Sequence, residues 1–150
     1  MEILNMIKED TIFIGLDVSS REECIQAMID GMGKAGFVNN KAIYLEAVNA
    51  REQKGSTGVG FGVAIPHGKS SGVVSPGLAF ACLQQPIDWN SLDGKPVQIV
   101  FMIGVPEKDA GNEHLKILIA ISRKLIHEDF RNKLLAVNSS AELYAILESI

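Results

Sequence analysis

Hydrophobic and polar positions along the chain follow two repeats, one typical of strands and one typical of helices. A short β-branched segment, residues 11–16, predicts a strand. The capping box Ser20-Arg21-Glu22-Glu23 then predicts the start of a helix that ends at Gly36. A second helix is expected to begin after Asn40 and to end at about Arg51. The first third of the chain therefore predicts one strand followed by two helices.

The rest of the chain predicts strands first and helices afterwards. Strand-like runs cover residues 62–65, 78–83 and 97–103, and the last two are nearly continuous apolar runs of the kind buried on both faces of a sheet. Helical patterns follow, one capped by Asn112 and two more over 129–137 and 140–147. This order predicts an α/β fold with a mixed β-sheet flanked by helices on both faces. With no internal repeat or linker, a single domain over residues 1–150 is expected.

Composition and charge exclude several classes of function. The chain has 150 residues, of which 47% are apolar, so one continuous core is expected. A net charge of −4 gives no basic field, and nucleic-acid binding is not expected. Cys24 and Cys82 fit small core residues in a reducing compartment. Because the sequence shows no signal peptide and no apolar run of membrane-spanning length, a cytoplasmic location without direct membrane insertion is expected.

One segment departs from the acidic average and predicts an anion site. No Asp or Glu occurs from residue 53 to residue 87; Arg51 lies just before that window, and Lys54, His67 and Lys69 lie in its first half. Glycines at positions 55, 58, 60 and 62 let backbone amides approach a phosphate closely. For the glycines alone, a flexible turn between helix and strand is the better interpretation.

Known nucleotide motifs fail on spacing. A Walker A loop places four residues between its first glycine and Gly-Lys-Ser, whereas Gly62 and Gly68-Lys69-Ser70 are separated by five. A dinucleotide fingerprint requires a helix straight after the glycines, but residues 63–66 form an extended segment ending in proline. Neither nucleotide-binding interpretation is supported.

His67 is the candidate nucleophile of this segment. It follows Pro66 and precedes Gly68, so we expect it at the end of a strand, where the chain turns and the ring is exposed. A neutral imidazole attacks phosphorus at neutral pH, because its ordinary pKa of ~6.5 leaves one nitrogen unprotonated while the other is held by a hydrogen bond. Arg51 offers a planar fork of donors for the charge that develops on the transferring oxygens.

The other two histidines have weaker sequence support. His114 falls two residues after Asn112, at a helix N-terminus that favours an anion, and would bond a phosphate or fix the His67 ring. A capping or solvent-facing role for His114 is an equal alternative. His127 lies at a junction between two predicted helices and is interpreted as a partner of a helix C-terminus. A metal-dependent or serine hydrolase has little support, since these histidines are poorly spaced for one metal.

The same residues resemble a known family. Residues 51–52, 55–60 and 62–68 resemble the active-site signature of fructose/mannitol-type (type 2) enzyme IIA domains of the bacterial phosphoenolpyruvate-dependent sugar phosphotransferase system. Residues 93–97, 114–118, 130–135 and 141–143 are similar to the C-terminal half of that domain. The resemblance implies the mixed sheet between helices, a phosphoryl group carried on Nε2 of His67, and phosphate-stabilising roles for Arg51 and His114.

The resemblance also implies partners. The donor would be the histidine-containing phosphocarrier protein and the acceptor an enzyme IIB domain during uptake of a fructose- or mannitol-type sugar, with no metal, nucleotide or other cofactor. The IIB domain is expected outside these 150 residues, on another chain or on another part of a longer protein. The same holds for the membrane enzyme IIC with which this enzyme IIA domain would associate. A regulatory enzyme IIA of the nitrogen-regulation type, signalling by phosphorylation-dependent protein binding, is the alternative. Phe61 departs from the family pattern, in which a polar residue is more frequent, and its ring is interpreted as part of a partner-docking surface.

Overall fold

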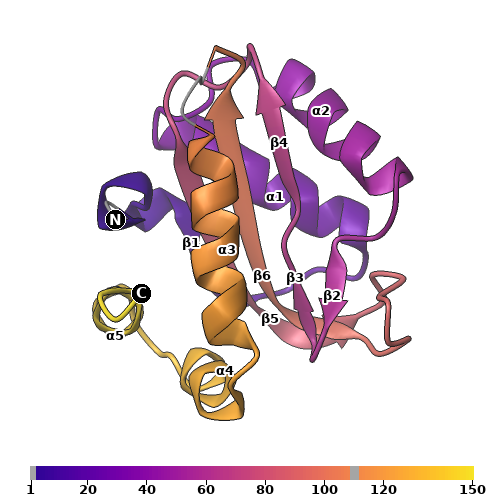
Figure 1. The fold of residues 1–150 in the computed structure, drawn as a ribbon, viewed down its shortest axis with the longest axis vertical. Helices are drawn as coiled ribbons and strands as arrows, with labels where there is room; N and C mark the ends of the chain where they lie inside the picture. Colours follow the sequence, from indigo (N-terminus) through magenta and orange to yellow (C-terminus); the bar gives the residue numbers. More distant parts are fainter. Residues whose placement is uncertain (1–2, 109–111) are drawn as a thin grey trace.

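The computed structural model describes residues 3–108 and 112–150, except for the side chains of residues 113 and 114. The described residues form one six-stranded mixed sheet with helices on both faces (Figure 1). In chain order the elements are η1 (Ile3–Met6), η2 (Glu9–Thr11), β1 (Ile12–Leu16), α1 (Arg21–Lys34), α2 (Lys41–Gln53), β2 (Gly58–Gly60), β3 (Val63–Ala64), β4 (His67–Ser70), β5 (Gly77–Ile87), β6 (Val97–Pro106), α3 (Glu113–Leu125), α4 (Glu128–Leu135) and α5 (Ser140–Leu147). The predicted α/β fold is confirmed.

The long strand β6 organises the sheet. The strand order is β1-β5-β6-β3-β2, and β4 also pairs with β6. The β5–β6 and β2–β3 pairs are antiparallel, whereas β1–β5, β3–β6 and β4–β6 are parallel. Two short strands thus lie end to end along one side of β6, with Ala64 opposite Val100 and His67 opposite Ile103.

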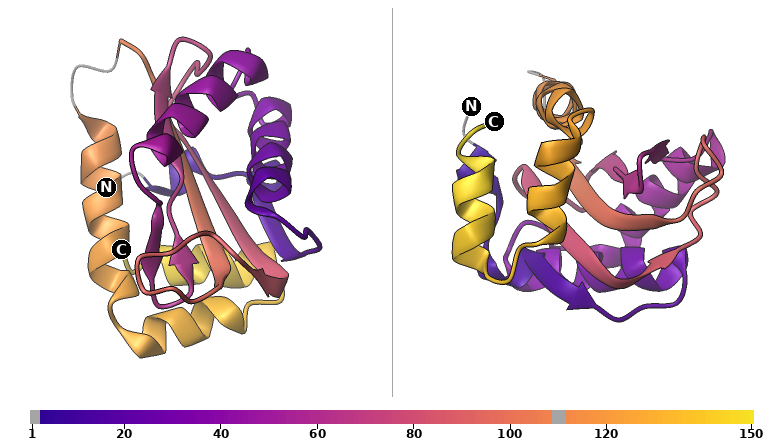
Figure 2. Two further views of the ribbon diagram at one scale, coloured as in Figure 1. Left: turned by 90° about the vertical axis from the view of Figure 1, so that its right-hand side faces the viewer. Right: turned by 90° about the horizontal axis from the view of Figure 1, so that it is seen from below.

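Two separate apolar layers cover the sheet. Helices α1 and α2 lie on one face and α3, α4 and α5 on the other (Figure 2). Along β6 the side chains alternate, so that Ile99, Phe101 and Ile103 pack with α3 while Val100 and Met102 pack with α1 and α2. This alternation confirms that the strand is buried on both faces.

Local sequence signals start the first two helices. The Ser20 side chain accepts a hydrogen bond from the amide of Glu23, 3.1 Å away, and the Asn40 side chain accepts one from Ile43 at 3.1 Å. Asn112 does stand immediately before α3, but its backbone is left-handed with φ 54° and its side chain makes no capping hydrogen bond. The predicted start of α3 is therefore confirmed, but the predicted capping role of the Asn112 side chain is wrong.

No helix in residues 3–108 and 112–150 is long and apolar enough to cross a membrane. Cys24 and Cys82 are both buried free thiols, as expected, and burial raises the pKa of Cys24 to about 12. Such a thiol stays protonated and behaves as a small core residue.

Candidate functional site

His67 opens a strand rather than closing one. The sequence placed it at a strand end where the chain turns, but it is the first residue of β4 and its ring is half-buried. Because His67 pairs with Ile103 in parallel register, its side chain lies on the same face as that of Ile103. That is the face covered by α3. Pairing with β6 therefore directs the imidazole toward α3, and no turn is needed to present it.

The ring orientation of His67 is fixed by its own chain. Nδ1 lies 2.9 Å from the carbonyl oxygen of Ile65, two residues back. Since a carbonyl only accepts, Nδ1 carries the proton, and Nε2 of the neutral ring has the lone pair. This is the tautomer required for nucleophilic attack through Nε2.

Helix α2 runs along β4, on the face of the sheet opposite the one that bears the His67 ring. A Cβ added at Gly68 would lie 3.2 Å from the Cβ of Ala47 and 3.3 Å from the amide nitrogen of Val48. Arg51 is four and three residues beyond these contacts, on the same helix face. Because Gly72 packs against the start of α2 and Gly68 against its middle, the end of α2 lies level with His67. The fold thus places Arg51 near the level of His67 along β4, and contact between the two side chains stays a prediction.

The guanidinium of Arg51 is held by the turn that directly follows α2. Its Nη1 donates to the carbonyl oxygen of Gly55 at 2.8 Å. No described carboxylate forms an ion pair with it. The positive charge of Arg51 is therefore not neutralised by the parts of the chain that the structure describes, which suits a group that meets an anion.

His114 is the second residue of α3, in the first turn of the helix. Its side chain lies outside the described part of the structure, so its contact with His67 stays a prediction. Helix α3 packs on the face of the sheet that bears Ile103 and the His67 ring. His127 stands between α3 and α4, the junction predicted for it, and its exposed side chain makes no capping hydrogen bond.

Residues 68–72 have the Gly-x-Ser-x-Gly spacing of a serine hydrolase, a class that received little support from the sequence. The structure does not use it as a nucleophile elbow, because Ser70 is buried at the end of β4 and its Oγ accepts the Gly72 amide at 3.0 Å. A hydrolase based on Ser70 is therefore unsupported.

The turn after α2 is tied down by residues that sequence reasoning did not single out. The buried carboxylate of Glu52 accepts hydrogen bonds from the amide and the hydroxyl of Thr57, and Thr57 Oγ1 accepts the indole N–H of Trp89 at 3.0 Å. Helical spacing could have identified Glu52 from the sequence, because it follows the buried residues Tyr44 and Val48 at intervals of four. A charged residue on a buried face calls for partners.

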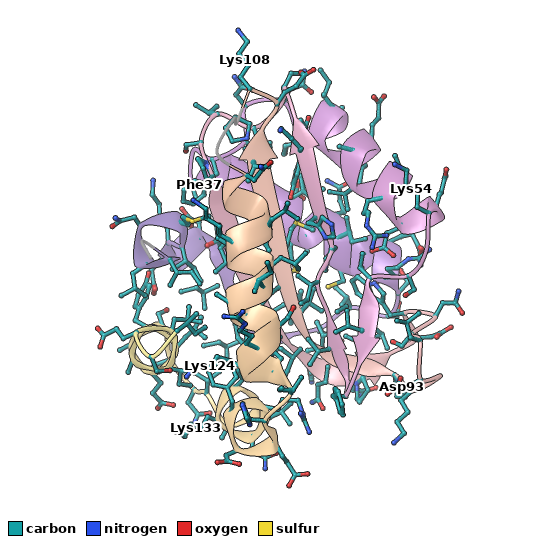
Figure 3. All side chains as sticks on the ribbon, viewed as in Figure 1. Phe37, Lys54, Asp93, Lys108, Lys124 and Lys133 are labelled. Carbon is teal, nitrogen blue, oxygen red and sulfur yellow. The ribbon has the colours of Figure 1, made fainter. Side chains whose placement is uncertain are left out.

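The turn between β2 and β3 displays an aromatic ring. Gly60, Phe61 and Gly62 have φ of 102°, 60° and 76°, and Phe61 is 59% exposed. The Phe61 amide donates to Asp93 Oδ2 at 3.1 Å, across to the β5–β6 loop, where Figure 3 labels Asp93. A non-glycine residue with positive φ is strained, so this hydrogen bond helps to hold the ring outward.

An apolar cavity of about 130 Å³ lies between this turn and the end of α3. Its wall includes Phe61, Ile65 and Ile126, and the Arg131 guanidinium lies 4.5 Å from the centroid of the Phe61 ring. Ile65 also accepts the hydrogen bond from His67 through its backbone carbonyl, so one residue of the cavity wall is bonded to the imidazole. Val59 and Ile126, two further residues of the wall, are exposed apolar side chains. The arrangement fits a contact surface.

Within the described residues, no group of three or more His, Cys, Asp and Glu side chains is placed to hold a metal ion. The candidate site residues are an imidazole with a fixed tautomer and a guanidinium that pairs with no carboxylate of the described residues. An imidazole nucleophile and a cation are the groups that phosphoryl transfer requires.

Comparison with known proteins assigns this chain to a family of phosphoryl-transfer components. Residues 5–150 match the family model described as "Phosphoenolpyruvate-dependent sugar phosphotransferase system, EIIA 2". The chain belongs to this family, and the resemblance seen in the sequence is confirmed.

Two kinds of relatives are similar to the chain. It is 40% identical over 132 residues to the fructose-specific EIIA component of Haloferax volcanii, covering 88% of this chain and 85% of that protein. It is 37% identical over 147 residues to a nitrogen regulatory protein of Bradyrhizobium diazoefficiens, covering 98% and 95%. The crystal structure of nitrogen regulatory protein IIA-Ntr from Neisseria meningitidis shares the fold, with TM-score 0.88, 33% identity, and 95% and 97% coverage.

Some relatives are much longer. The chain is 37% identical over 147 residues to the fructose-specific EIIABC component of Bacillus subtilis, covering 98% of this chain but only 23% of that protein.

Proposed function

We propose that the protein is a phosphoryl carrier that accepts a phosphoryl group on Nε2 of His67 and passes it to a second protein. The observation that carries the proposal is the hydrogen bond from Nδ1 of His67 to Ile65, which leaves the Nε2 lone pair as the nucleophile. Nε2 forms a bond to phosphorus as the bond to the donor's histidine nitrogen breaks, and that nitrogen keeps the electron pair. In transfer to the acceptor, the acceptor's nucleophile forms a bond to phosphorus as the bond from Nε2 of His67 breaks, and Nε2 keeps the electron pair.

Arg51 and His114 are proposed to stabilise the phosphoryl oxygens. Charge spreads over three oxygens during transfer, and a guanidinium without a carboxylate partner is suited to receive it. His114 would approach from the start of α3, where free helix amides also favour an anion. After transfer, the phosphohistidine carries about two negative charges near neutral pH, by analogy with other phosphorylated side chains. We expect Arg51→Ala to slow transfer more than it lowers stability.

The proposed partners are the histidine-containing phosphocarrier protein as donor and an enzyme IIB domain as acceptor. The transfer would take place in the cytoplasm and support uptake of a fructose- or mannitol-type sugar. Support comes from family membership and from the fructose-specific relatives, one of which is named as a combined A, B and C component. A membrane enzyme IIC would associate through the IIB domain. The proposed docking surface is the apolar cavity with Phe61, whose wall includes Ile65, the backbone partner of His67.

A regulatory role is the second candidate. It is favoured by the 37% identity to a nitrogen regulatory protein over nearly the full length of both chains and by the solved IIA-Ntr structure. In this role the charge state of His67 would select binding partners rather than feed a sugar. Transfer to a panel of IIB domains separates the two: rapid transfer to one of them supports uptake, and transfer to none supports regulation.

The decisive experiment is phosphorylation in a defined mixture. The protein is incubated with phosphoenolpyruvate, enzyme I and the phosphocarrier, and intact mass is recorded. We expect a gain of one phosphate in the wild type and none in His67→Ala. His127→Ala is the matched control, since His127 is exposed and lies outside the site. Full labelling of His67→Ala would overturn the proposal.

A further inference from the structure

A buried carboxylate stands directly after Arg51 in the last turn of α2. Glu52 is only 9% exposed, and its Oε2 lies 3.3 Å from the amide nitrogen of Thr57 and 3.7 Å from Nη1 of Arg21. Oε1 accepts the Thr57 hydroxyl. A charge in such a place is stable only when it is paired and hydrogen-bonded. Arg21 from α1 and Thr57 meet both needs.

The bond between Glu52 and Thr57 closes the turn that follows α2. Thr57 is 2% exposed, and its Oγ1 also accepts the indole N–H of Trp89. Ser56 Oγ donates to the Trp89 carbonyl oxygen at 2.9 Å. The turn is thus anchored to the β5–β6 loop at two adjacent residues. Trp89 is the only tryptophan of the chain and is 1% exposed, so the anchor is rigidly packed.

The Arg51 side chain depends on the same turn. Its Nη1 donates to the carbonyl oxygen of Gly55, which lies between the two residues that the Glu52–Thr57 pair joins. An arginine side chain is long and flexible, and its use on a transferring phosphoryl group requires a defined position. The Glu52 carboxylate is bonded to Thr57 and paired with Arg21 rather than with Arg51. The positive charge of Arg51 therefore remains available for an anion.

We propose that Glu52 and Thr57 are positioning residues for Arg51. The pair holds the Gly55 carbonyl in place, and that carbonyl fixes the position of the guanidinium, which the proposed function brings to the phosphoryl group on His67. The inference rests on the proposed function, in which Arg51 contacts the phosphoryl group. Neither residue touches the phosphoryl group itself.

Thr57→Val tests the pair, because valine keeps the shape and removes the hydroxyl. We expect the rate of transfer to His67 at saturating phosphocarrier to fall about tenfold or more, as small misplacements of catalytic groups do. The donor concentration for half-maximal rate should stay unchanged, since the apolar docking surface is intact. Thr57→Ser should restore the rate. Glu46→Gln, an exposed acid on the same helix, is the matched control. A wild-type rate in Thr57→Val would overturn the inference.

A double mutant separates positioning from general stability. If Thr57 acts through Arg51, then Thr57→Val adds no further loss of rate in an Arg51→Ala background. An equal further loss in that background would mean that Thr57 supports the fold rather than Arg51. Glu52→Gln serves as a second variant should Thr57→Val fold poorly, and Trp89 fluorescence reports whether the anchor is intact.

A measurement without phosphoryl transfer keeps the two proposals apart. The Nε–Hε NMR signal of Arg51 should report one ordered environment in the wild type and move toward the position of a free arginine in Thr57→Val. If the wild type takes no phosphate on His67, the proposed function fails while this signal still tests the positioning. An Arg51 signal identical in both proteins would overturn the positioning role.

Discussion

The hydroxyl of Tyr44 donates a hydrogen bond to the carbonyl oxygen of Ile103, 2.8 Å away. Ile103 is the residue of β6 that pairs with His67, so a buried side chain of α2 braces the strand opposite the reactive histidine. Burial raises the pKa of Tyr44 well above its ordinary value, so the phenol is protonated at neutral pH and donates.

Tyr44→Phe removes this hydrogen bond and leaves the ring. We expect the free energy of unfolding to fall by about 1 kcal/mol, the net value of one such bond, plus any cost of the carbonyl lone pair left without its donor. Urea unfolding followed by Trp89 fluorescence measures it. Tyr144→Phe, at a half-buried position in α5, is the control and should change stability little. Equal stability of Tyr44→Phe and the wild type would show that the bond contributes nothing.

The long elements were predictable because their signals are local. Helices α1 and α2 begin at capping side chains, and β5 and β6 are continuous apolar runs. Strands β2 and β4 were not predicted, because three residues (Gly-Val-Gly) and four residues (His-Gly-Lys-Ser) are too short to show a period. They are strands only through pairing with β3 and β6.

The same distinction applies to the site. The sequence singled out His67 and Arg51 as candidates by residue type and by an acid-free window that contains His67 and begins two residues after Arg51. The direction of the imidazole was not, because it follows from the register of β4 on β6, a contact between residues 36 positions apart (His67 and Ile103). Thr57 was not identifiable either, since its two partners, Glu52 and Trp89, come from separate elements.

Gly68→Ala should displace α2 from β4. The new methyl group would lie 3.2 Å from the Cβ of Ala47 and 3.3 Å from the backbone of Val48, and backbone cannot move aside cheaply. We expect a loss of about 1–3 kcal/mol in the free energy of unfolding and slower phosphorylation of His67, because Arg51 moves with the helix. Chemical denaturation and the phosphorylation assay measure the two effects.

Gly33→Ala is the matched control for that substitution. Its methyl group would meet mainly the flexible side chain of Lys41, at 3.1 Å, and Gly33 lies within α1. Alanine is the better helix former by up to about 1 kcal/mol. Stability should therefore be unchanged or higher. A Gly68→Ala protein that matches Gly33→Ala in both measurements would show that α2 is not held tightly on β4.

Phe61→Ala should weaken docking of the phosphocarrier. Truncating an exposed ring beside the apolar cavity removes contact area, and loss of an interface anchor commonly costs more than about 1 kcal/mol, or roughly fivefold in affinity. The half-saturating donor concentration should rise while the maximal rate of phosphorylation stays the same. Val74→Ala, which removes an equally exposed apolar side chain near the opposite end of β4, should leave both unchanged. A fall in maximal rate alone would place Phe61 in the chemistry instead.

The position of Phe61 should respond to acid through Asp93. The Lys95 amide, 3.0 Å from Oδ1, holds the pKa of the Asp93 carboxyl below its ordinary value of 3.8, and the Phe61 amide lowers it further. A lowered folded-state pKa means that the stabilisation is present above pH 3.8 and is lost as the pH falls through the folded value. An NMR titration should show the Phe61 amide shift following the Asp93 carboxyl below pH 3.8. Asp93→Asn should abolish that step, whereas Asp17→Asn, an exposed acid after β1, should preserve it. A Phe61 amide that titrates identically in Asp93→Asn would show that the carboxylate does not hold the turn.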